Sequence, residues 1–541
     1  MLIRNAFRPG IFYSFSFRPN PTWSTFFPNG PEIAKYLYTV CDEYTLVDKI
    51  QLNTDVSEVR WLADEEEWEV TLTHMVAGTG DLSNKERQKR MAEQGRDSVY
   101  LKQEIVRAKV VASCAGGLVE PNAWPESIPG RESFEGDVFH SARWNYNVSL
   151  NEKDVIVVGT GCSAAQFVPM LTKSPYNAKS VTQIMRSPPW VIPRLLTPGG
   201  NEKYEKYAPK LFNRIPGLAR TLRTLLFMLS ELDFYTVFLE KNKEKRKSVE
   251  AKLIKHMKRT VPEKYHEILT PDYGVGCKRR IFDATWFPGL NDPKIELTTQ
   301  PLTSIQPRGV TLGPGRTYPD PKNVDSKAPT DEVKLPADTI ILANGFELTT
   351  WLHPLKIYGK EGKLMQDVWD ERGGPQAYMG SAMDGFPNLF IIFGPNTATG
   401  HSSVILASEN MVEYGLKFIE PILKGDVKTI EVKKEAEIGW TKKMQEKLKD
   451  TVWMSGGCHS WYKTANGWNA TAYPSVSLTK VYIVILTYTT IQRFSNRLHV
   501  EVHVSEMERL EFQLHSERAD EEEGKESFQN LCAHSDHRGC L

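Results

Sequence analysis

Several signals that assign a protein to a broad class are weak or absent in this chain of 541 residues. Lysine plus arginine and aspartate plus glutamate both number 67, so the formal net charge is zero. A chain without net charge has no overall attraction to nucleic acid or to an anionic membrane. The composition is that of an ordinary globular protein, and the length allows two or three domains.

The cysteines give no sign of a disulfide scaffold. There are seven, an odd number, and none forms a C-x-x-C pair; they are Cys41, Cys114, Cys162, Cys277, Cys458, Cys532 and Cys540. Scattered cysteines argue against a disulfide framework and favour a reducing compartment. We therefore expect a cytoplasmic protein.

Long uninterrupted hydrophobic runs are also missing. The most apolar long stretch, 218–241, contains Arg220, Arg223, Glu231 and Asp233, which a membrane-spanning helix rarely tolerates. We expect a buried or amphipathic helix there and no integral membrane span. Residues 1–17 lack the apolar core of a signal peptide.

The remaining pattern predicts alternating helices and strands. A helix is expected at 31–44, strands at 50–62 and 68–74, and an exposed loop across the polar residues 76–98. The charged stretch 243–259 predicts a helix with a solvated face. The segment 481–541 turns rich in Glu, His and Ser, and we expect a divergent, disordered tail.

The stretch DVIVVGTGCSAAQ (154–166) predicts a strand, a glycine turn and a helix. Its spacing is that of a dinucleotide fingerprint, in which the first glycine makes the turn and the second admits a pyrophosphate. The small third residue lets the helix pack closely on the strand, and the helix N-terminus meets the phosphate charge. The expected binding residues are Gly159, Thr160, Gly161, Cys162, Ser163 and Ala164.

The strand after this turn indicates which nucleotide is bound. An NAD site carries an acidic residue about 20 residues beyond the fingerprint, where it binds the ribose hydroxyls. Here the strand ends in Arg186 and Ser187. A guanidinium suits a 2′-phosphate, so we predict NADP, with a surface arginine as the alternative reading.

A third motif lies just upstream of the fingerprint. Phe134, Gly136, His140 and Trp144 have the spacing FxGxxxHxxxW. This pattern resembles the fingerprint of type I Baeyer–Villiger monooxygenases, a branch of the flavin-containing monooxygenase superfamily. In that family the motif links the two nucleotide domains, which implies conformational coupling and not proton transfer.

Other stretches are similar to the same family, from about residue 12 to about 474. GCKRRIFD (276–283) resembles its CKR segment, which implies Lys278 beside the NADP phosphate and Arg279 as the catalytic residue beside the flavin, with the adjacent Arg280 as the open alternative. ILANGF resembles a turn beside the cofactors, which implies Asn344 and Gly345 as binding residues. FPNLFIIFGPN resembles a flavin segment, which adds Gly394, Pro395 and Asn396.

The resemblance implies an α/β fold with two Rossmann-like dinucleotide-binding domains, the NADP domain being inserted into a discontinuous FAD domain. The FAD domain would take residues 1–150 and 333–480, and the NADP domain, with a helical insertion, residues 151–332. The implied reaction uses FAD, NADPH and O2 to insert one oxygen atom next to the carbonyl of a small apolar ketone, plausibly in secondary metabolism. No metal is expected.

The chain departs from the family pattern at both ends. The family opens with a βαβ unit whose GxGxxG binds the FAD pyrophosphate, and residues 1–12 contain no such turn. We therefore expect the ADP half of the FAD site to be missing, with exposed apolar strand edges and poor solubility as the consequence. Two alternatives stay open: an N- or S-oxygenating flavin monooxygenase, and a truncated, inactive NADP-binding remnant.

Overall fold

The computed structural model describes residues 9–475, apart from 195–196, 216, 321–327, 348–350, 353, 459, 461 and 465, together with three short strands between 502 and 515. Most of the tail predicted at 481–541 lies outside the described residues. The three short strands are β18 (Val502–Val504), β19 (Glu508–Leu510) and β20 (Phe512–His515).

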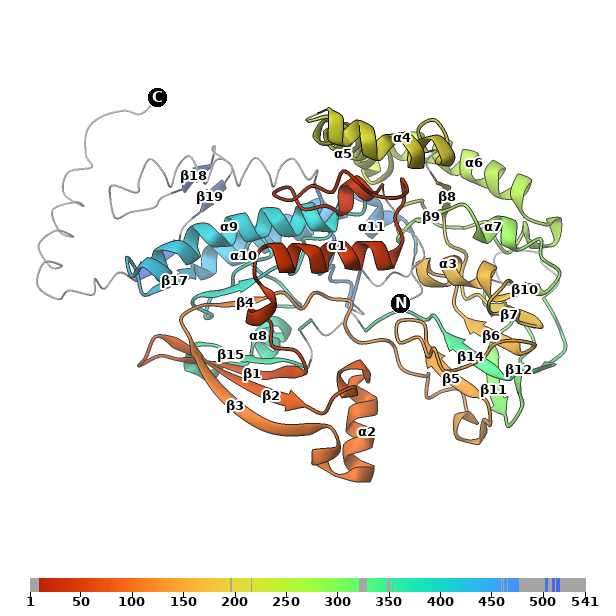
Figure 1. Cartoon of the computed structure of the whole chain (residues 1–541), viewed down its shortest axis with the longest axis horizontal. Helices are drawn as coiled ribbons and strands as arrows, with labels where there is room; N and C mark the ends of the chain where they lie inside the picture. Colours follow the sequence, from red (N-terminus) through yellow and green to blue (C-terminus); the bar gives the residue numbers. More distant parts are fainter. Residues whose placement is uncertain are drawn as a thin grey trace, which may run out of the picture.

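A five-stranded parallel sheet forms the half of the molecule at the right of Figure 1. Its order is β10-β7-β6-β14-β5, and every pair in it is parallel. The strands are β5 (Asp137–His140), β6 (Asp154–Val158), β7 (Ser180–Ile184), β10 (Ile295–Thr298) and β14 (Thr339–Leu342). The continuous apolar runs of β6 and β14 suit strands covered on both faces. The predicted α/β class is confirmed.

Two of these strands come from outside the range 151–332 that was predicted for the NADP domain. β5 precedes that range, β14 follows it, and β14 lies between β5 and β6. The chain therefore enters and leaves this half of the molecule through neighbouring strands. Helices α3 (Cys162–Leu171) and α7 (Trp286–Gly289) pack on the sheet, and beside it lies an antiparallel sheet of β11 (Leu302–Gln306), β12 (Gly309–Leu312) and β13 (Val333–Pro336).

A helical insertion lies above this sheet in Figure 1. It consists of α4 (Asn201–Arg214), α5 (Leu218–Val237) and α6 (Lys243–Thr260), and it is framed by the parallel pair β8 (Val191–Pro193) and β9 (Ile281–Asp283). α5 confirms the amphipathic helix expected from 218 onwards. α6 has the predicted solvated face, with only Arg246, Leu253 and Met257 buried.

The other half of the molecule combines small sheets with long helices. One sheet has the order β15-β1-β2-β3, and two pairs, β16 with β4 and β17 with β20, stand apart from it. The strands are β1 (Thr54–Leu62), β2 (Glu67–Met75), β3 (Tyr100–Ala108), β4 (Val111–Ser113), β15 (Lys356–Tyr358), β16 (Leu389–Ile391) and β17 (Thr429–Val432). The helices are α1 (Gly30–Glu43), α8 (Met365–Glu371), α9 (Val404–Lys424), α10 (Lys434–Lys449) and α11 (Val452–Ser455).

The exposed loop expected at 76–98 is wrong for its second half. Residues 84–94 form helix α2 (Asn84–Gln94), which begins at a capping box: the Ser83 side chain accepts from the Glu86 backbone N–H, and the Glu86 carboxylate accepts from the Ser83 backbone N–H. This reciprocal cap starts a helix in a segment without an apolar face. The S-x-x-E spacing was present in the sequence and was the signal that could have predicted it.

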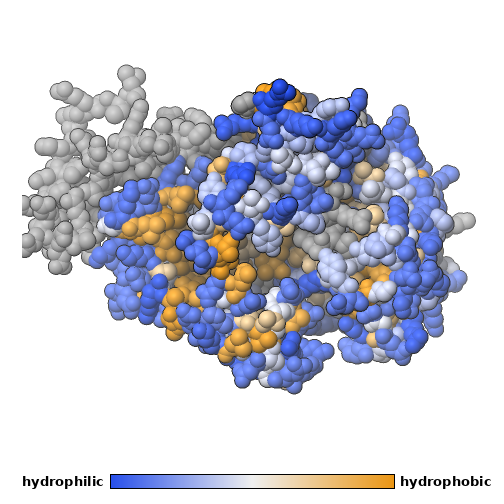
Figure 2. Space-filling view, in the orientation of Figure 1, coloured by the Kyte–Doolittle hydropathy of each residue, from blue (hydrophilic) through white to orange (hydrophobic). Residues whose placement is uncertain are grey.

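Apolar side chains gather on one visible face, over α9 and beside β1–β3 (Figure 2). The exposed members include Val412, Leu416 and Leu423 of α9 and Leu101 and Ile105 of β3. Among the helices in the described part of the chain, none is long and apolar enough to cross a membrane.

A buried ion-pair network ties α8 to α10. Arg372 donates to Glu437 at 2.9 Å and to Asp384 at 2.8 Å, and the backbone N–H of Asp384 donates to Glu437 at 2.7 Å. Burial raises the pKa of Glu437 to about 7, against the opposing effects of the Asp384 N–H and Arg372. The network fixes the loop before β16 against the long helices.

We predict that Glu437→Ala lowers the free energy of unfolding by about 2–4 kcal/mol, because it leaves a buried guanidinium with only Asp384 as an anionic partner. Urea unfolding measures this value. The matched control, Lys424→Ala, breaks an exposed ion pair with Glu420 on α9 and should leave the free energy of unfolding nearly unchanged. Equal effects of the two substitutions would contradict the assignment.

Candidate active site

Four strand ends and two loops surround a cavity of about 1820 Å³. Its wall includes the fingerprint turn after β6, the end of β7, the Lys278–Arg279 step, the turn after β14 and part of the loop 457–467. Pockets for one small molecule typically measure 300–1,000 Å³. The cavity is therefore large enough for more than one ligand.

The fingerprint turn depends on glycine at both expected positions. Gly159 has φ +118°, and a Cβ there would lie 2.4 Å from the carbonyl oxygen of Ala343. At Gly161 a Cβ would meet no described atom within 4 Å, so this backbone faces open space in the cavity wall. Gly161 also starts α3, whose N-terminus has no side-chain cap. Backbone N–H groups at such a helix start are donors suited to an anion.

The rest of the fingerprint divides between wall and core. Thr160, Cys162 and Ser163 line the cavity, whereas Ala164 is fully buried against the sheet. Gln166, one turn further along α3, also lines the cavity, and its buried Oε1 has no hydrogen-bond partner among the described residues. A buried amide oxygen aimed at a cavity suits a ligand donor.

A buried side-chain latch holds the turn, and sequence reasoning missed it. Gln183 donates to the Gly159 carbonyl oxygen at 2.8 Å, and the Trp286 indole N–H donates to Gln183 Oε1 at 2.9 Å. Both side chains are fully buried. The one signal available was a polar residue inside the buried strand β7, where it needs a partner.

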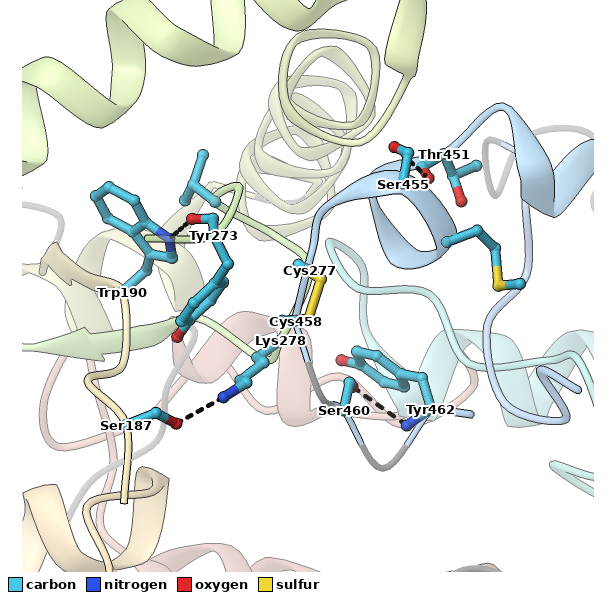
Figure 3. Close-up of a disulfide and its surroundings, with 12 residues drawn as sticks. Ser187, Trp190, Tyr273, Cys277, Lys278, Thr451, Ser455, Cys458, Ser460 and Tyr462 are labelled. Carbon is cyan, nitrogen blue, oxygen red and sulfur yellow. Dashed lines mark hydrogen bonds between the residues drawn. A yellow bond between two sulfur atoms is a disulfide. The ribbon is translucent and has the colours of Figure 1, made fainter. Parts of the chain in front are cut away.

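Two cations meet at the end of β7. Lys278 Nζ donates to Ser187 Oγ at 2.7 Å and lies 4.7 Å from the centre of the Tyr273 ring (Figure 3). Burial, and then the charge of nearby Arg186, lower the pKa of Lys278 to about 8. Two neighbouring cations and a hydroxyl form a site suited to a phosphate.

The two adjacent arginines point to different places. Arg279 lines the cavity: protein surrounds it closely, and its side chain remains accessible from the cavity itself. Burial opposes its charge, but Cys162 and Tyr462 raise its pKa, so Arg279 stays protonated. Arg280 is buried and pairs with Asp233 of α5, with its guanidinium 4.9 Å from the centre of the Phe238 ring.

The upstream motif is split between cavity wall and core. His140 lines the cavity at the end of β5; its Nδ1 accepts from the Ala142 N–H at 3.0 Å, and burial lowers its pKa. Gly136 is required by a close approach, since a Cβ there would lie 2.2 Å from the Asp338 carbonyl oxygen. Phe134 is in the core, and Trp144 packs against Phe139, Phe167 and Tyr176.

The two turns predicted to bind cofactor, at 344–345 and 394–396, differ in their access to the cavity. Asn344 and Gly345 line it. Gly394, Pro395 and Asn396 are not part of its wall: the Asn396 amide donates to the carbonyl oxygens of Asn469 and Ala472, and a Cβ at Gly394 would lie 2.4 Å from the Gly380 carbonyl oxygen. These three residues shape a tight turn behind the wall.

A disulfide joins two parts of the wall. Cys277 and Cys458 are bonded, although 181 residues separate them (Figure 3). The sequence argued against a disulfide framework and did not predict this bond; Cys41, Cys114 and Cys162 are unpaired. Sequence spacing could not reveal the pair, because the two segments meet only in the folded chain. The bond fixes the Lys278–Arg279 step against the loop 457–467.

Comparison with known proteins adds the following. A family model described as flavin-binding monooxygenase-like matches residues 10–204. A Baeyer–Villiger monooxygenase of Streptomyces coelicolor is 30% identical over 472 residues, covering 87% of this chain and 79% of the relative. A Baeyer–Villiger monooxygenase of Pseudomonas aeruginosa is 30% identical over 465 residues, which cover 85% of this chain and 77% of the relative.

Solved structures show the fold. A steroid monooxygenase bound to NADP has a TM-score of 0.68 at 20% identity, covering 95% of this chain and 90% of the other. A closed cyclohexanone monooxygenase has a TM-score of 0.68 at 21% identity, and the match covers 95% of this chain and 91% of the other. This likeness confirms the predicted arrangement of two Rossmann-like domains, one inserted into the other.

We predict that Cys458→Ser lowers the free energy of unfolding by about 2–5 kcal/mol, since the disulfide restrains a long loop of the unfolded chain. Denaturant unfolding measures the loss, and peptide mapping without reductant should recover the Cys277 and Cys458 peptides joined. The control Cys41→Ser should change stability by less than about 1 kcal/mol. Recovery of the two peptides unjoined from non-reduced protein would contradict the pairing.

Proposed function

Because this chain belongs to the Baeyer–Villiger monooxygenases, which are NADPH-dependent flavoproteins, we propose that it oxidises an apolar ketone to an ester or lactone. The balanced reaction takes ketone, O2, NADPH and one proton to ester, NADP⁺ and water. The observation that carries the proposal is that Arg279 and the cation pair of Lys278 and Arg186 open onto one cavity. A role in secondary metabolism stays a prediction.

The residues of the NADP side fit their cofactor. The uncapped N-terminus of α3 and the open backbone at Gly161 suit the pyrophosphate. The site of the 2′-phosphate would be formed by Lys278, Ser187 and Arg186. The two cations repel each other in the empty site, and a phosphate dianion between them replaces this repulsion with attraction. The same pair would serve NAD less well, since NAD carries no phosphate there.

The wall also offers positions that fit FAD. Asn344 and Gly345 line the cavity, and Gly345 has φ +93° with only the Asn122 amide near the place of a Cβ. The small residues after β4 are open as well: a Cβ at Gly116 would meet no described atom within 4 Å. These backbones would hold the flavin side of FAD. When bound, FAD accepts reducing equivalents from NADPH and activates O2.

Arg279 stabilises the negative charge that develops on oxygen. Its guanidinium keeps its positive charge at any working pH and presents a planar set of donors. Its approach to Cys162 places it beside the start of α3. Preorganised donors at a developing oxyanion typically contribute about 3–4 kcal/mol. The disulfide at Cys277, two residues away, restricts where Arg279 can move.

The neutral His140 has no part in proton transfer in this proposal. It lies between the end of β5 and the turn after β14, with its ring 5.9 Å from that of Phe346. A lowered pKa keeps the imidazole uncharged at neutral pH. We propose that Phe134, Gly136, His140 and Trp144 position the two nucleotide-binding turns relative to each other.

We predict that Arg279→Ala lowers oxygenation at least about a hundredfold while the affinity for NADP⁺ changes only severalfold. Product analysis with a cyclic ketone and a thioether, with FAD and NADPH in excess, measures this. The exposed Arg308→Ala serves as the charge-matched control. Sulfoxide without lactone from the unmodified protein would favour the N- or S-oxygenating alternative, and NADPH consumption at the background rate would favour the inactive remnant.

We predict that NADP⁺ affinity falls as pH rises through about 8, where Lys278 loses its proton in the unliganded protein. The bound phosphate favours the charged form of the Lys278 amine. Above that pH the amine must therefore take up a proton when NADP⁺ binds, and the affinity should drop roughly tenfold from pH 7 to pH 9. Titration calorimetry follows the dissociation constant. Lys278→Arg should remove the pH dependence, and NAD⁺ should show none with either protein. A flat profile for the unmodified protein would rule out this role for Lys278.

A further inference from the structure

Helix α5 differs from the usual surface helix: its inward face carries charged side chains beside the core residues Phe234 and Val237, and its outward face is largely apolar. A surface helix normally turns its apolar stripe inward and its charges to water. Three of the four charged side chains of α5 point inward and pair across to other elements: Arg223 with Glu409, Glu231 with His401 and Asp233 with Arg280. The N–O distances of the first two pairs are 3.4 and 3.1 Å.

The outward face of α5 carries apolar side chains. Leu225, Met228, Leu229, Leu232 and Tyr235 are exposed by 55, 46, 52, 61 and 47%. Their spacing places them on one stripe of the helix. Within 218–237, which the structure describes completely, Glu231 is buried and Asp233 is partly exposed and paired with Arg280.

The preceding helix extends this surface. Tyr207 and Leu211 of α4 and Ile215, the residue that follows it, are exposed, while Tyr204 and Ala208 pack inward on Phe26 and Phe27. We define the α4–α5 surface as these three residues together with the five of α5. A surface of this kind indicates a binding site for another apolar surface, because it is costly to leave in water.

Exposed cations accompany the apolar residues. They are Lys203, Lys206, Lys210 and Arg214 of α4 and Arg220 of α5. Among the described residues of 201–237, the exposed acids are Glu202 and Glu205, and Asp233 is partly exposed. Lys206 lies over the ring of Tyr207, with its Nζ 5.4 Å from the ring centre. The zero net charge of the whole chain does not cancel this local excess, because screening limits charge effects to about 10 Å.

We propose that the α4–α5 surface docks on the face of an anionic lipid bilayer. Apolar residues interleaved with lysine and arginine on a helix suit the boundary between headgroups and acyl chains. A second copy of this chain fits less well, since the same cations would face each other across a symmetric contact. The inward ion pairs hold α5 in place, so docking needs no unfolding. The proposal is independent of the oxygenation reaction.

Flotation with vesicles tests this. The full chain is mixed with vesicles of phosphatidylcholine alone or with about 30% phosphatidylserine, at about 0.1 M salt. We expect flotation with the anionic vesicles, a smaller fraction with neutral ones, and loss at high salt. Leu229→Gln/Leu232→Gln should reduce the bound fraction about tenfold on both. Lys206→Gln/Lys210→Gln should reduce it on anionic vesicles only.

The matched control is Leu416→Gln/Leu423→Gln on α9, whose leucines are exposed by 51 and 66%. It should leave flotation unchanged, and thermal melting should show that all variants fold. Failure of the unmodified protein to float with either vesicle would overturn the proposal, as would an equal loss in the α9 control. Light scattering that shows a dimer lost only in the α5 variant, without vesicle binding, would assign the surface to a second copy.

Discussion

The register of β14 between β5 and β6 is the constraint on which the rest of the site depends. Leu342 pairs with His140 on one side and with Val158 on the other, and Val158 in turn pairs with Ile184. Four parallel strands therefore end in line, and the chain after each contributes to one edge. The carboxyl edge of such a sheet is where ligands bind. A slip of one residue in any pair would turn its side chains to the other face.

The same register explains why glycine is needed at 159. The turn after β6 passes so close to the Ala343 carbonyl that no side chain fits between them. Gln183 and Trp286 hold the turn from the opposite side. The donors for a nucleotide phosphate are therefore already in position, and little binding free energy is lost in ordering them. The disulfide at Cys277 likewise limits the movement of the link that carries Arg279.

Sequence reasoning reached the parts of this site that local chemistry determines. Gly159 and Gly161 were predicted because a tight turn and a close approach demand glycine, and the α/β class follows from buried strands such as β6. The Cys277–Cys458 bond and the Gln183–Trp286 latch could not be predicted, since each joins segments that meet only after folding. Sequence also could not separate Arg279 from Arg280; the distinction arises because Asp233 of α5 takes the second guanidinium.

That last pairing links the site to the outer surface. Arg280 is buried and Asp233 is partly buried, and replacing water around two charges is favourable only when their geometry is good. To supply Asp233, α5 must turn a charged face inward, and its apolar face then points outward. The exposed stripe of α5 is thus a consequence of placing Arg279 towards the cavity and Arg280 away from it. Such an apolar surface suits a partner that covers it, and the cations of α4 match it chemically to an anionic lipid headgroup layer.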